Sequence, residues 1–206
     1  MKIDLHIHEK TYSLDSQASL EDIIIEARRK GLDAITITDH DNNDIKEYAK
    51  EVSKHENFPI FVGVEYLTQQ GDIVAFGIDK VPDIKMDIQD FVDLVNSQGG
   101  VCITAHPYRT NNRGLKDKIK VVNGLHAIEA FNGNTDEENN YKAHQVAKRL
   151  GIQSVGASDA HKSEEVGKFA TLLPYEVKDI NELIEAIKSN RCKPLEYRNG
   201  NYVIID

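Results

Sequence analysis

The sequence predicts an α/β fold in which strands alternate with amphipathic helices around a parallel sheet. Short apolar runs of β-type residues are separated by segments whose apolar residues recur every three or four positions. Strands separated by such helices are typical of βαβ units, and the chain carries about seven of these strands. The Rossmann fingerprint and the P-loop pattern are both absent. A closed β/α barrel and an open doubly wound sheet both fit this pattern.

The first half begins with a predicted strand over residues 2–7 and a helix over 19–31. Ser19 suits the N-cap, with Asp22 three residues later, and Gly31 suits a left-handed C-terminal turn. The apolar positions of this helix follow the helical spacing: Leu20, Ile23, Ile24 and Ala27. Further strands are predicted over 33–38, 59–64 and 71–78, and a further helix over 45–53.

The second half repeats the alternation. A helix is predicted between Asp87, its N-cap, and Gly99, where it stops. Two later helices each carry one apolar face, the first ending at Gly151 and the second covering 180–187. The predicted strands are 101–105, 125–131, 154–157 and 169–173, followed by a hairpin of 193–197 with 202–206 around Asn199-Gly200. The polar stretch 109–120 has no clear element.

Length and composition indicate one globular domain over residues 1–206. The chain has no linker, low-complexity tract or internal repeat, and its hydrophobic and charged fractions are 40% and 29%. No apolar run approaches the roughly 20 residues of a membrane span, and no signal peptide is evident. Two cysteines do not make a disulfide framework. We expect a cytoplasmic protein that does not associate with membranes.

Residues that can bind metal ions follow the predicted strands. They include five of the eight histidines. The set consists of His6 and His8; Asp39, His40 and Asp41; Glu65; His106; Glu129 and Asn132; and Asp159 and His161. In β/α barrels the active site is built at the carboxyl ends of the strands. Each residue alone fits a structural role, but so many at one rim would carry too large a desolvation cost without cations. The sequence therefore predicts a metal site.

Four other residues fit structural roles better. His126 has the opposite strand parity to Glu129 and should face the helices. His144 lies on a polar part of its helix, and His55 lies in a charged helix end or loop. Cys102 fits a buried core position.

The motifs "DLHIH", "YSLDS", "TDHD", "GVEY", "AHPY", "IEAFNG" and "SDAH", in this order, resemble the PHP family of polymerase and histidinol phosphatase proteins. The resemblance spans residues 3 to about 162. An H-x-H pair alone also begins the barrel of amidohydrolases, but "TDHD" and the closing "SDAH" favour the PHP family. The resemblance implies a distorted (β/α)7 barrel, similar to a TIM barrel, with the metal site at the C-terminal ends of its strands.

The resemblance also implies three groups of metal ligands. The first ion would be held by His6, His8, Glu65 and Asp159. Glu65 would bridge to a second ion, held also by His106 and Glu129. The third ion would be held by Asp15, His40 and His161. Asp4 would orient a histidine ligand, and no clear role follows for Asp39.

Mixed histidine and carboxylate ligands suit zinc, manganese or iron, with two or three ions per chain. Such a centre predicts a phosphatase that hydrolyses a small phosphomonoester by a metal-bridging hydroxide. The residues expected to carry catalysis are His6, His8, Glu65, Asp159 and His161. Arg109 and Asn132 are candidates for binding the substrate, although a surface arginine and a turn-forming asparagine fit them equally well.

Three alternatives remain open. A nuclease or phosphodiesterase acting on nucleotides or short oligonucleotides would use the same metals. A net charge of −9 and the lack of a basic stripe argue against binding of long nucleic acid. A non-catalytic, metal-stabilised binding module and an amidohydrolase acting on C–N bonds are the others. The segments expected to set specificity are the 68–72 turn and the 109–120 stretch.

Overall fold

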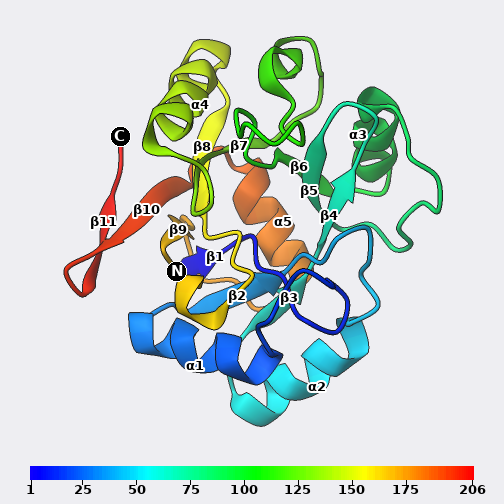
Figure 1. The fold of residues 1–206 in the computed structure, drawn as a ribbon. Helices are drawn as coiled ribbons and strands as arrows, with labels where there is room; N and C mark the ends of the chain where they lie inside the picture. The colour runs from blue at the N-terminus through cyan, green and yellow to red at the C-terminus, as the bar shows by residue number, and fades with distance from the viewer.

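The computed structural model describes residues 1–206, and its strands form two sheets (Figure 1). The strands of the first sheet are β1 (Lys2–Asp4), β2 (Ala34–Ile37), β3 (Ile60–Val62), β9 (Phe169–Leu172), β10 (Lys193–Arg198) and β11 (Asn201–Ile204). Those of the second are β4 (Val64–Leu67), β5 (Asp72–Phe76), β6 (Val101–Thr104), β7 (Ala127–Asn132) and β8 (Gln153–Ala157). The spatial orders are β11-β10-β9-β1-β2-β3 and β4-β5-β6-β7-β8.

The helices form where the apolar spacing predicts them. They are α1 (Leu20–Lys30), α2 (Lys46–Glu56), α3 (Ile88–Ser97), α4 (Glu137–Leu150) and α5 (Ile180–Lys188). The Ser19 side chain accepts from the Asp22 amide, and Gly31 adopts a left-handed conformation with φ of 75°, so both predicted ends of α1 are confirmed. The 109–120 stretch contains a 3-10 helix, Lys116–Lys120. None of the helices has the length and apolar character needed to span a membrane.

The prediction of a mixed α/β fold is confirmed, but the strands do not close into a barrel. β1, β2 and β3 run parallel, as do β6, β7 and β8. β5, however, runs antiparallel to both β4 and β6, because the turn at Gly71 returns the chain in a hairpin. β9, β10 and β11 are also antiparallel to their neighbours. The fold therefore lacks the repeated parallel unit of a closed β/α barrel.

The predicted strand 59–64 divides at Gly63 into β3 and β4, which belong to different sheets. A Cβ atom at Gly63 would lie 2.6 Å from the Ala75 carbonyl oxygen, so only glycine allows this close approach. Between the two sheets, isolated bridges join Ile7 to Ala160 and His40 to Glu65. Both bridges involve segments that carry candidate ligands, so the edges of the sheets meet where those side chains gather.

An apolar cluster fills the space between the sheets on the other side of these ligands. It includes Ile3 and Leu5 from the first segment, Phe76 and Ile103 from the second sheet, and Leu183 from α5. In Figure 1, α1 and α2 lie along the first sheet, α3 and α4 along the second, and α5 lies between them. This packing gives the ligand-bearing segments a buried apolar base.

Candidate metal centre

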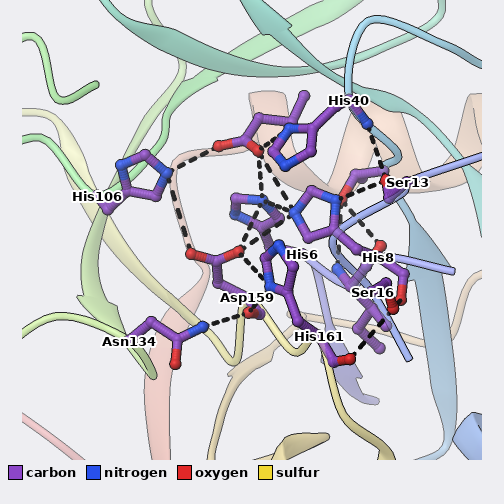
Figure 2. Close-up of polar contacts among 12 residues, drawn as sticks. His6, His8, Ser13, Ser16, His40, His106, Asn134, Asp159 and His161 are labelled. Atoms are coloured by element: carbon purple, nitrogen blue, oxygen red, sulfur yellow. Dashed lines mark hydrogen bonds and ion pairs between the residues drawn. The ribbon is translucent and has the colours of Figure 1, made fainter. Parts of the chain in front are cut away.

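Four side chains from three segments meet at a common point (Figure 2). His6 and His8 follow β1, and the alternation of the extended chain directs both rings to the same side. Glu65 lies in β4, and Asp159 follows β8. All four side chains are at most 1% exposed, so the point at which they meet is shielded from bulk water.

The spacing of these four groups fits one metal ion. The Nε2 atoms of His6 and His8 lie 3.0 Å apart. Each of them lies 3.2–3.5 Å from Glu65 Oε2 and Asp159 Oδ1. Four ligands at about 2.0–2.1 Å from a tetrahedral ion would be about 3.3 Å from one another. Histidine nitrogens and carboxylate oxygens are also the donors that zinc, manganese and iron accept.

The buried carboxylates of Glu65 and Asp159 need positive charge beside them. Burial lowers the pKa of His6, but the carboxylates of Asp159, Glu129 and Glu65 outweigh it and hold that pKa well above its usual value. Burial also opposes protonation of His8, yet its contacts with Asp159 and Glu65 raise its pKa to about 9. The neighbouring carboxylates thus favour positive charge at these rings, and a bound cation would supply it.

A second group consists of Glu65, Asp72 and His106. His106 Nε2 lies 2.7 Å from Glu65 Oε1 and 3.7 Å from Asp72 Oδ2. Glu65 thus presents one oxygen to each group, as the predicted bridging role requires. Burial and the neighbouring Glu65 raise the pKa of Asp72 to about 6. Sequence analysis did not identify Asp72 as a ligand.

Glu129, the predicted third ligand of this second group, lies elsewhere. Its Oε1 atom is 3.0 Å from His6 Nδ1, and its Oε2 atom accepts the His106 backbone amide at 2.6 Å. Both oxygens are therefore occupied in orienting other ligands, and Asp72 stands where Glu129 was expected. A carboxylate on the distal nitrogen of a histidine fixes the tautomer that leaves the other nitrogen free to bind metal.

A third group surrounds His40 and His161, which are about one-quarter exposed. Asp15 Oδ2 lies 3.2 Å from His40 Nε2 and 3.4 Å from His161 Nε2, and His8 completes the cluster. His161 Nδ1 donates to the Asp159 carbonyl at 3.0 Å, so its Nε2 atom is the free acceptor. The three predicted residues Asp15, His40 and His161 are thus brought together.

The backbone is strained at two of these residues. His106 has a φ of 29° and Asp159 a φ of 53°, values that non-glycine residues seldom adopt. Such strain costs about 1–3 kcal/mol per residue and concentrates at functional sites.

Asp4 has a different role from the one expected. It accepts the backbone amides of Ser158 and Gly167, at 2.9 and 2.8 Å, and that of His6. It orients the segment before Asp159 rather than a histidine ring.

Two arginines reach the centre from the segment after β6. Arg109 donates to the Asp159 carboxylate and, at 2.5 Å, to Asn132 Oδ1. Arg113 forms a bidentate pair with Asp72, at 2.6 and 3.1 Å, and approaches His40 Nδ1 at 3.3 Å. Arg109 and Asn132 therefore lie beside the ligands, as predicted candidates for substrate binding should. Arg113 was not singled out from the sequence.

The residues expected to have structural roles lie away from the centre. His126 Nδ1 accepts the Cys102 amide, and Cys102 is fully buried in an apolar cluster. His55 is exposed at the end of α2. His144 differs from the expectation of a polar position: it is buried, its ring contacts Ser154 Oγ at 2.9 Å, and it packs against Phe131.

Comparison with known proteins gives matches in sequence and in fold. A family model described as PHP-associated matches residues 137–192. An uncharacterized protein of Methanocaldococcus jannaschii is 27% identical over 161 residues, which cover 73% of this chain and 94% of that protein.

Two solved structures share the fold. One is described as a metal-dependent phosphoesterase from Bifidobacterium adolescentis, with a TM-score of 0.68 and 16% identity over 90% of this chain and 95% of that one. The other is a lesion-specific endonuclease from Pyrococcus furiosus, with a TM-score of 0.67 and 17% identity over 91% of this chain and 56% of that one. The PHP-associated match and the ordered motifs whose residues converge on this centre agree with the resemblance to the PHP family.

Proposed function

We propose that this protein is a metal-dependent phosphatase that hydrolyses a small phosphomonoester. The observation that carries the proposal is the position of two cationic side chains beside the ligand carboxylates. Arg109 contacts Asp159, and Arg113 contacts Asp72. Guanidinium groups bind phosphate oxygens in pairs of hydrogen bonds, so the two arginines suit a phosphoryl group lying over the centre.

The chain's own residues would bind and orient the reactants. His6, His8, Glu65 and Asp159 would hold the first ion, Glu65, Asp72 and His106 a second, and His40, His161 and Asp15 a third. Zinc, manganese and iron suit these donors. Bound divalent ions would supply Lewis acidity and lower the pKa of an attacking water. Arg109 and Asn132 would contact the phosphoryl oxygens, and no side chain is required as nucleophile.

Solvent access supports a substrate that enters from the rim. His40, His161, Arg109 and Arg113 are between 16% and 33% exposed, whereas the first-ion ligands are buried. A phosphoryl group could therefore reach the arginines while the leaving group stays in solvent. The fold of the Bifidobacterium protein described as a metal-dependent phosphoesterase agrees with this proposal.

The experiment is a screen of phosphorylated metabolites against protein reconstituted with zinc, manganese or iron, with inorganic phosphate and metal content measured together. We expect phosphate release from at least one small monoester, dependent on added metal. Metal-loaded protein that releases ammonia or amines from C–N substrates, and no phosphate from any ester, would contradict the proposal.

One observation favours a second candidate, a nuclease acting on short oligonucleotides. Lys116 and Lys118 follow Arg113 and are exposed, whereas Lys120 is paired with Asp117, so some positive charge lies beyond the centre. The structurally similar Pyrococcus protein is an endonuclease. A mononucleotide and a short oligonucleotide of the same sequence, assayed side by side, separate the two candidates, since a phosphatase should release phosphate from the mononucleotide faster.

A further inference from the structure

The motif "TDHD" contains a buried carboxylate that the metal centre does not use, that of Asp39, which is 1% exposed. Asp39 Oδ1 accepts two hydrogen bonds, from the Glu9 amide at 2.7 Å and from the Ser13 hydroxyl at 2.9 Å. Ser13 is also 1% exposed. In Figure 2 it lies between His8 and His40, close to both. Asp39 is therefore linked to His8 through a single buried hydroxyl group.

The Ser13 hydroxyl has its whole hydrogen-bonding capacity in use. A hydroxyl carries one hydrogen and two acceptor lone pairs. The hydrogen goes to the Asp39 carboxylate, which accepts only. The His40 backbone amide donates to Ser13 Oγ at 3.1 Å and takes one lone pair. The second lone pair faces His8 Nδ1, which lies 3.2 Å away.

These contacts determine which nitrogen of His8 carries hydrogen. With its own hydrogen committed to Asp39, Ser13 Oγ can only accept from His8 Nδ1. The Nδ1 atom must therefore be the protonated one, and in the neutral ring the lone pair lies on Nε2. That atom is the one that faces His6, Glu65 and Asp159. His6 is oriented in a similar way, but by direct contact with Glu129.

We propose that Asp39 and Ser13 form a relay that holds His8 in the Nδ1–H tautomer and so directs its Nε2 atom to the first metal ion. Both are positioning residues, because neither faces the point at which the ligands meet. The relay rests on the proposed metal centre and gives the family motif "TDHD" a second function beside the ligand His40. The His40 amide bond ties the same hydroxyl to the third ligand group.

The test compares four variants. Ser13→Ala removes the hydroxyl, Asp39→Ala frees its hydrogen to point at His8 Nδ1, and the double variant removes both. Ser13→Thr keeps the hydroxyl as a conservative rescue. Ser16→Ala is the matched control, because Ser16 is a buried serine of the same segment whose hydroxyl contacts the His8 and His161 carbonyls instead of a ring.

Two readouts are taken on the full-length protein, after circular dichroism has shown that each variant is folded. Zinc affinity is measured by competition with a chelator, and the ring nitrogens of His8 are followed by long-range ¹H–¹⁵N NMR in zinc-loaded protein. We expect Ser13→Ala and Asp39→Ala each to bind zinc about tenfold to a hundredfold more weakly, the usual effect of removing such a hydrogen-bond partner. They should also lose the single signal pattern of a protonated Nδ1 and a ligated Nε2.

The relay predicts that the double variant binds zinc no more weakly than the more affected single variant, since both break one chain of contacts. Ser13→Thr and Ser16→Ala should keep the wild-type pattern. Additive losses in the double variant, an unchanged His8 pattern in Ser13→Ala, or wild-type protein that binds no zinc would overturn the relay. Neither readout uses a phosphoester, so zinc-binding protein without phosphatase activity would remove the proposed function and leave the relay standing.

Discussion

The Nε2 atoms of His6 and His8 lie 3.0 Å apart, although both rings are buried and could not stay so close as two imidazolium ions without strong compensation. The compensation comes from Glu65 and Asp159. Against the effect of burial, His6, His106 and His40 hold the pKa of Glu65 well below the usual range, and His6, His8 and His106 do the same for Asp159. The pair of rings is therefore the inner part of a site arranged for a cation.

Replacing His8 or Asp159 with alanine should abolish tight binding of the first ion. Each change removes one of four donors and leaves the remaining buried charges unbalanced. We expect hydrolysis of p-nitrophenyl phosphate to fall by at least a hundredfold in both variants, with metal content measured by elemental analysis. His55→Ala, at an exposed position, is the control. Full turnover in either ligand variant would contradict the assignment.

Asp72 and Glu129 should differ in their effect on metal stoichiometry. Asp72→Asn replaces an anionic donor of the second group with a weaker, neutral amide oxygen and should lower the number of ions bound per chain, while the first ion stays. Glu129→Gln leaves all donors of the three groups in place and should retain the stoichiometry with an affinity about tenfold to a hundredfold weaker. Elemental analysis after gel filtration distinguishes them. A loss of one ion in Glu129→Gln but not in Asp72→Asn would restore Glu129 as the ligand.

Arg109→Gln should weaken substrate binding more than it weakens metal binding. Hydrogen bonds to charged groups contribute about 1.5–3 kcal/mol, so KM should rise about tenfold to a hundredfold. Arg109→Lys keeps the charge but loses the paired hydrogen bonds, so its KM should lie between those of the wild type and Arg109→Gln. Steady-state kinetics on one monoester, with metal content held equal, gives the comparison. An unchanged KM in Arg109→Gln would show that this arginine serves only Asp159.

His144 predicts a pH dependence of stability that is independent of the metal centre. Burial, aided by Lys148, lowers the pKa of this histidine below its usual value. A histidine whose pKa is depressed in the folded state contributes stability above its unfolded pKa of about 6.5, and this stability is lost as the pH falls. The Tm should therefore drop more between pH 7.5 and 5.5 in the wild type than in His144→Gln. Equal drops would remove His144 as the cause.

The sequence predicts the candidate ligands best where they lie at or just after the carboxyl ends of strands. His6, His8, Glu65, His106, Asp159 and His161 were all expected at one rim because they follow or end predicted strands, and the structure brings them together there. Asp72 was missed because it begins its strand. β5 runs antiparallel to its neighbours, so its first residue, not its last, lies at this rim.

The other differences between the predicted and the observed structure also arise from contacts between segments distant in the sequence. Nothing in the apolar pattern of 59–64 shows that Gly63 passes the chain from one sheet to the other. The hydrogen-bond partners of Glu129, Ser13 and Asp39 depend on segments brought together only by folding. Residue type and spacing therefore predicted most candidate ligands. The division of the strands into two sheets and the groups that orient the ligands depend on three-dimensional contacts.

Anomalous diffraction from crystals loaded with zinc or manganese tests the central claim most directly, because it locates each ion independently of activity. The account predicts a peak about 2.0–2.2 Å from His6 Nε2, His8 Nε2 and one oxygen each of Glu65 and Asp159. Peaks found only at other places in fully loaded crystals, with these four side chains free of metal, would contradict it.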